Sequence, residues 1–144
     1  MNSNTQDFSR RMVIVVRKDI EAWQVTDAIS HISAYLGNKM NQPFDTGEHF
    51  TSKDNIKYPR NSQYPIITKV ANSSEQLYNL FEKVSDTALV HIAFIRQMID
   101  HADDAILQKE ISSKNSKELE YLGVGIFGSN DEVNTLTKKF SLFS

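Results

Sequence analysis

Residues 12–16 read MVIVV, an uninterrupted apolar run in which every side chain after the first is β-branched. Such a run is typical of a β-strand that is covered on both faces by other elements. A second run of this kind, GVGIF at residues 123–127, lies near the other end of the sequence. The two runs predict two strands of a buried sheet.

The segment between these strands alternates between helical and strand patterns. Apolar side chains recur every three to four residues from residue 22 to residue 36, which predicts an amphipathic helix that Gly37 ends. The same reading predicts two further strands and three further helices: strands at 65–70 and 88–95, and helices from Ser73 to about 84, at 103–111 and after Ser129. Four strands separated by helices indicate an α/β fold with helices on both faces of the sheet.

The length and composition fit one domain with one core, since the 144 residues are 40% hydrophobic and 24% charged. The polar residues 1–11 predict a flexible N-terminal leader, and residues 12–144 a single domain. Within this domain, residues 38–63 contain proline, glycine and many polar side chains without any periodic pattern. We expect a long loop there, and loops of that length are usually lids or binding segments.

Charge and cysteine content exclude several classes of function. A formal net charge of −2 argues against a protein held mainly by nucleic-acid phosphates. The absence of cysteine excludes disulfides, thiolate catalysis and cysteine-bound metal. The basic pair at residues 10 and 11 precedes only about five apolar residues, too few for a signal peptide or a membrane span. We therefore expect a cytoplasmic protein with no membrane contact.

Two end segments carry a resemblance to a known family. The segment from Met12 to Asp19 resembles the opening strand of the type II peptidyl-tRNA hydrolases, and residues 122–128 with the helix after them resemble their closing strand and helix. With Ala22-Trp23-Gln24 included, the chain is more similar to an uncharacterised bacterial family of that fold, known as domain of unknown function two thousand. The resemblance implies a three-layer fold whose four-stranded mixed sheet has the opening and closing runs as neighbours. It also implies a homodimer.

The resemblance does not extend to the hydrolase chemistry. Type II hydrolases keep a lysine near the start of the first helix and an aspartate after the third strand, whereas residues 22–38 hold no lysine and residues 95–99 read IRQMI. The leading hypothesis is therefore a binding or regulatory module for a small molecule or a peptide. The alternative is a hydrolase of peptidyl-tRNA or a related ester with a different catalytic set, and a structural partner protein is a third class.

Four residues around the end of the first strand are candidate ligand-binding residues. Arg17 and Asp19 follow the strand at the edge where open α/β sheets commonly bind ligands, and Trp23 and Gln24 begin the helix beside it. A surface ion pair explains Arg17 and Asp19 equally well, and anchoring in the core explains Trp23.

The hydrolase alternative needs a catalytic pair, which Asp27 and His31 offer. Their spacing of four places both side chains on one helix face, where the carboxylate can orient the imidazole for general-base work. The same spacing is also what an ordinary solvated helix face produces.

The remaining motifs favour structural interpretations. The glycines at 123, 125 and 128 spell G-x-G-x-x-G, but only sixteen residues follow, too few for the strand that a dinucleotide site requires, so we expect close packing instead. We predict no cofactor and no metal site. The other polar clusters are assigned to helix starts, the core and loop solubility: Asp100, His101, Asp103 and Asp104; His91; and Lys53, Lys57 and Arg60.

Overall fold

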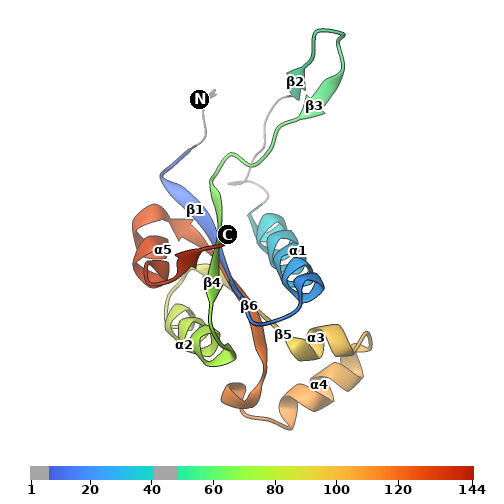
Figure 1. Ribbon diagram of the computed structural model, residues 1–144, viewed down its shortest axis with the longest axis vertical. Coiled ribbons are helices and arrows are strands. Elements are labelled where there is room, and N and C mark those ends of the chain that lie inside the picture. Colours follow the sequence, from blue (N-terminus) through green and yellow to red (C-terminus); the bar gives the residue numbers. More distant parts are fainter. Residues whose placement is uncertain (1–6, 41–48) are drawn as a thin grey trace.

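Five strands form a mixed sheet in the order β5-β6-β1-β4-β7 in a computed structural model, which describes residues 7–40 and 49–144 (Figure 1). The strands are β1 (Arg10–Arg17), β4 (Ile66–Ala71), β5 (Val90–Ile95), β6 (Tyr121–Ser129) and β7 (Ser141–Leu142). β1 is central and pairs in parallel with β4 and antiparallel with β6. The expectation that the opening and closing runs are neighbours is therefore confirmed.

The expected four-stranded sheet has a fifth strand, β7, at its edge. β7 consists of two exposed residues, which pair with Lys69 and Val70 of β4. A strand of two residues is too short to show an alternation of apolar and polar side chains, and only its long-range pairing with β4 identifies it. The sequence reading therefore missed it.

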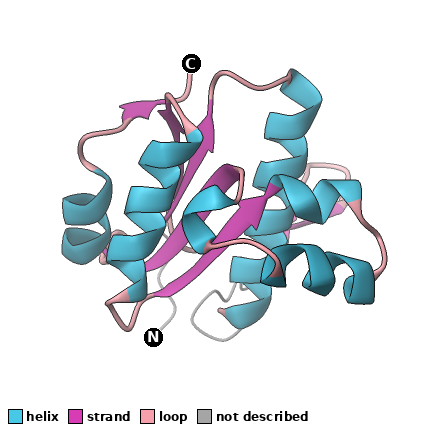
Figure 2. Ribbon diagram, turned by 90° about the horizontal axis from the view of Figure 1, so that it is seen from below, coloured by secondary structure: helices cyan, strands magenta, loops and turns pink. Residues whose placement is uncertain are grey.

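Helices cover both faces of the sheet (Figure 2). They are α1 (Ala22–Lys39), α2 (Ser74–Ser85), α3 (Arg96–Asp100), α4 (Asp104–Ser112) and α5 (Asn130–Thr137), with a 3-10 turn η1 (Ser116–Glu118). The helices predicted from Ser73 and after Ser129 are confirmed, and both serines are caps, because their hydroxyl oxygens accept from the backbone N–H groups of Gln76 and Glu132. The short helix α3 was not predicted.

β1 separates two apolar layers. The side chains of Met12, Ile14 and Val16 pack with those of α1, and the side chains of Val13 and Val15 pack with those of α2 and α5. All five side chains are buried. This alternation explains why β1 is apolar at every position from residue 12 to residue 16, as expected for a strand covered on both faces.

Gly37 does not end α1, and that prediction is wrong. The helix continues to Lys39, and the N–H of Met40 donates to the carbonyl oxygen of Leu36. Gly37 does not adopt the left-handed backbone conformation that makes glycine a helix terminator. Its position in α1 is thus an ordinary helical one, which any residue except proline can adopt.

Part of the expected loop at 38–63 is a β-hairpin. β2 (His49–Thr51) and β3 (Lys57–Pro59) pair antiparallel and project from the body of the molecule (Figure 1). The turn between them includes Asn55 with a φ of 67°. Residues 38–39 belong to α1, and residues 41–48 of the expected loop lie outside the described residues.

The expected leader overlaps the sheet. β1 begins at Arg10, two residues before the predicted start, and the carbonyl oxygen of Ser9 accepts from the N–H of Asn130. Residues 1–6 lie outside the described part of the chain. Separately, none of the described helices has the length and apolar character needed to cross a membrane.

Candidate functional site

A cavity of about 630 Å³ lies at the carboxyl ends of the parallel strands β1 and β4. After these strands the chain turns to opposite faces, where α1 covers one side of the sheet and α2 the other (Figure 1). Such a point of divergence is where open α/β sheets form their ligand crevice. The apolar lining includes Val25, Val70 and Phe140, and the polar lining includes Lys18 and Lys139.

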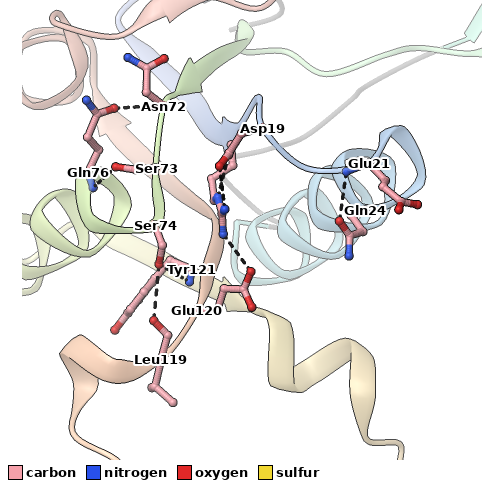
Figure 3. A network of polar contacts seen from close by, with 11 residues as sticks. Asp19, Glu21, Gln24, Asn72, Ser73, Ser74, Gln76, Leu119, Glu120 and Tyr121 are labelled. Atoms are coloured by element: carbon pink, nitrogen blue, oxygen red, sulfur yellow. Dashed lines mark hydrogen bonds and ion pairs between the residues drawn. The ribbon is translucent and has the colours of Figure 1, made fainter.

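The β4 side of the cavity is shaped by the start of α2 (Figure 3). The N–H of Asn72 donates to Oε1 of Gln76 over 2.8 Å, and the N–H of Gln76 donates to the hydroxyl of Ser73 over 3.2 Å. Because Oε1 of Gln76 is already an acceptor, its amide NH₂ group is what this side chain offers to a ligand. Asn72 and Gln76 both line the cavity.

Arg17 forms an ion-pair network beside the cavity. Its guanidinium donates twice to Asp19, over 2.9 and 2.8 Å, and once to Glu120 over 3.1 Å. The hydrogen bonds to Asp19 are the main reason that the pKa of Arg17 is raised, and the same bonds lower the pKa of Asp19. Figure 3 shows Asp19 and Glu120 in this network, which ties the end of β1 to the residue before β6. Neither Arg17 nor Asp19 lines the cavity, so their ligand-binding role stays a prediction.

The lowered pKa of Asp19 predicts an acid-dependent contribution to stability. A depressed carboxyl pKa stabilises the fold above the unfolded value of 3.8, and the gain is lost as the pH falls through the folded value. Since the Asp19 side chain is 46% exposed, Asp19→Asn should lower the free energy of unfolding at pH 7 by at most about 1 kcal/mol. Urea unfolding at a series of pH values should show the difference in stability between the variant and the wild type shrinking as the pH falls below 3.8 and through the lower folded pKa. Asp86→Asn, at an exposed position, is the control. A difference in stability between Asp19→Asn and the wild type that persists in acid would contradict the lowered pKa of Asp19.

Trp23 and Gln24 hold the start of α1. The side chain of Gln24 is buried and its Oε1 accepts from the N–H of Glu21 over 3.1 Å, as in a capping box. The indole N–H of Trp23 donates to the carboxylate of Glu21 over 2.7 Å, although Trp23 is 53% exposed. Neither residue lines the cavity. The Glu-x-x-Gln spacing was the signal for this cap, and the sequence reading overlooked it.

Asp27 and His31 are close together on the outer part of α1. Their side chains are 3.4 Å apart, and that of His31 is 60% exposed. The imidazole also stacks on Phe94, with ring centroids 5.0 Å apart. The pair does not line the cavity, and its catalytic role stays a prediction.

The other polar clusters have local structural roles. Asp103 caps α4 by accepting from the N–H groups of Ala105 and Ile106, and the ring of His101 contacts Glu110. Within the described ranges, no group of three or more metal-ligating side chains comes together. The remaining residues pack locally: His91 contacts the carbonyl of Leu89 and the ring of Phe81, and the guanidinium of Arg60 lies over Phe50.

Sequence reasoning missed the residues that line the cavity from β4, α2 and the last segment. Asn72 and Gln76 follow β4 just as Lys18 follows β1, so the same strand-end rule applies to all three. The rule could not be used for β4, because the order of the strands was unknown. Lys139 and Phe140 carry no local signal for a site.

Comparison with known proteins finds a family and a solved structure whose functions are both unknown. A family model described as "Protein of unknown function (DUF2000)" matches residues 10–144. The chain is also similar to a solved structure of a protein of unknown function from Agrobacterium tumefaciens strain C58. The TM-score is 0.81 at 17% sequence identity, over 96% of this chain and 100% of that chain, which shows a shared fold alone. None of the curated proteins matches the sequence.

Proposed function

The chain belongs to the DUF2000 family of proteins of unknown function, and we propose that it is a binding module for a small molecule or a short peptide. The ligand binds in the cavity at the carboxyl ends of β1 and β4, on a fold like that of the type II peptidyl-tRNA hydrolases. The single observation that carries the proposal is this cavity at the point where α1 and α2 diverge.

The size and lining of the cavity support binding. A volume of about 630 Å³ lies within the roughly 300–1,000 Å³ that is usual for small-molecule sites. Apolar side chains such as Val25 and Phe140 supply the contact area, and a few polar side chains supply orientation.

Binding is favoured over hydrolysis because the described lining of the cavity holds no histidine or acidic side chain. A general base is usually a histidine or a carboxylate within hydrogen-bond reach of the reacting proton. No histidine and no Asp or Glu side chain is among the described residues that line this cavity. The pair formed by Asp27 and His31 lies outside it, so a hydrolase would require a second, separate recess.

Filling the cavity should abolish binding. Ala22, the exposed first residue of α1, lines the cavity, and Ala22→Phe is expected to occupy it without disturbing the core. A fragment library followed by amide NMR should give ligands that shift residues 18–25 and 70–76 in the wild type. These shifts should disappear in Ala22→Phe.

The matched control is Ala34→Phe, an exposed position of the same helix that does not line the cavity. This variant should keep every hit. Hits that survive Ala22→Phe, or a library without any hit at these amides, would refute the proposed function.

A further inference from the structure

The ionised side chains that line the cavity are all of one sign. Two side chains of its lining are ionised at neutral pH, those of Lys18 and Lys139, and both are cations. No carboxylate side chain is among the described residues that line it, although the protein as a whole carries a net charge of −2. Among the described lining residues the anionic group is the terminal carboxylate of Ser144, so two cations stand against one carboxylate and the lining carries an excess of positive charge.

The carboxylates nearest in sequence to Lys18 are engaged elsewhere. Asp19 is held by two hydrogen bonds from Arg17, and the carboxylate of Glu21 accepts from the indole of Trp23. Within the described ranges, no carboxylate lies within ion-pair distance of Lys18 or Lys139. The ammonium of Lys139 instead lies over the ring of Phe140, 5.2 Å from its centroid. Both cations therefore line the same cavity without an ion-pair partner among the described residues.

The other polar groups of the cavity add donors. The amide of Gln76 offers its NH₂ group, because its oxygen accepts from Asn72. Between these donors lies an apolar surface that includes Val25, Val70 and Phe140. Cations and amide donors stabilise an anion, and the apolar surface gains from covering a hydrocarbon group.

We propose that the ligand is a small amphiphile with an anionic head, a carboxylate or a phosphate, which binds at Lys18 and Lys139 with its apolar part against Val25 and Phe140. This inference rests on the proposed function, since it assigns a chemical class to the ligand of the same cavity. It goes further by predicting which charge the site selects.

The test uses four probes with one apolar tail and different heads: phenylbutyrate, phenylbutyl phosphate, the neutral phenylbutanol and the cationic phenylbutylamine. Affinities come from amide NMR titrations that follow residues 18–25 and 70–76. We expect at least one anion to bind about tenfold or more tightly than the alcohol, and the amine to bind more weakly than the alcohol. The ratio of the affinities for phenylbutyrate and phenylbutyl phosphate shows which anionic head the site prefers.

Charge removal then identifies the groups responsible. The double variant Lys18→Gln with Lys139→Gln should reduce the affinity for the anion to that for the alcohol and leave the affinity for the alcohol unchanged. Lys83→Gln, an exposed position in the last turn of α2 outside the cavity lining, is the control and should behave like the wild type.

The outcomes separate the two claims. If the alcohol binds as tightly as both anions, or the double variant keeps the preference for the anion, the inference is wrong and the binding function stands. If none of the four probes shifts the cavity amides although fragment-library hits do, the inference is wrong and the binding function stands. If the library also gives no hit at these amides, both claims fail.

Discussion

Tyr121→Ala is expected to lower the free energy of unfolding by about 3–5 kcal/mol, the usual range for removing a large buried aromatic side chain. Tyr121 begins β6 and is 1% exposed. Its ring packs edge-on against Tyr78 with centroids 5.7 Å apart, and its hydroxyl donates to the carbonyl oxygen of Ser116 over 3.0 Å. Urea unfolding at neutral pH measures the loss, and a loss below about 1 kcal/mol would contradict the assigned packing.

Tyr121→Phe distinguishes the contribution of the hydroxyl to stability from that of the ring. It should cost only about 1 kcal/mol, the net value of one hydrogen bond. Burial raises the pKa of Tyr121 above its usual 10.0, with a smaller contribution from Tyr78. The unfolded side chain therefore ionises first, and the wild type should lose stability as the pH rises above about 10. In Tyr121→Phe the loss of stability above about pH 10 should be smaller than in the wild type. Equal losses in both proteins would show that the raised pKa of Tyr121 does not cause it.

Gly125→Ala should cost about 1–3 kcal/mol, as expected when a close-packed core receives an extra methyl group. A β-carbon at Gly125 would overlap Cγ2 of Ile32 and lie 2.9 Å from Cδ1 of Leu36, both on α1. The methyl group of Ile32 is attached directly to its Cβ and is stiff in a helix, so it cannot move aside. α1 would have to shift away from β6, and thermal or urea unfolding measures the penalty.

Two other glycines serve as controls for Gly125. A β-carbon at Gly128 would meet Cδ2 of Leu89, the far end of a half-buried side chain that can rotate, so Gly128→Ala should cost less. A β-carbon at Gly37 meets nothing within 4 Å, so Gly37→Ala should stabilise α1 by about 0.5–1 kcal/mol. A different ranking of the three variants would show that contact with α1 is not what excludes a side chain at Gly125.

The strands and helices with a long apolar period were predictable from the sequence. β1 and β6 are buried on both faces, and their composition reflects it. The elements that were missed, β7, the β2–β3 hairpin and α3, have between two and five residues each. Such short elements form because of the strand that pairs with them or precedes them. They are too short to produce a periodic apolar pattern in the sequence.

The sequence indicated the edge of the sheet at which the candidate cavity lies, but the residues predicted for the site do not line it. The end of β1 does border the cavity, through Lys18. The predicted residues Arg17 and Asp19 instead bond to each other, and Arg17 reaches Glu120 beside β6, whereas the cavity extends toward β4. Choosing between these two sides requires the strand order, which depends on contacts between residues far apart in the sequence.

The central position of β1 bears on how the chain folds during synthesis. Val13 pairs with Ile126, so the partner on one side of β1 is translated 113 positions after it. The partner on the other side, β4, is available much earlier, because Val13 also pairs with Ile67. A ribosome that stalls before residue 121 would therefore hold a nascent chain whose apolar first strand has one open edge, the kind of surface that chaperones shield from aggregation.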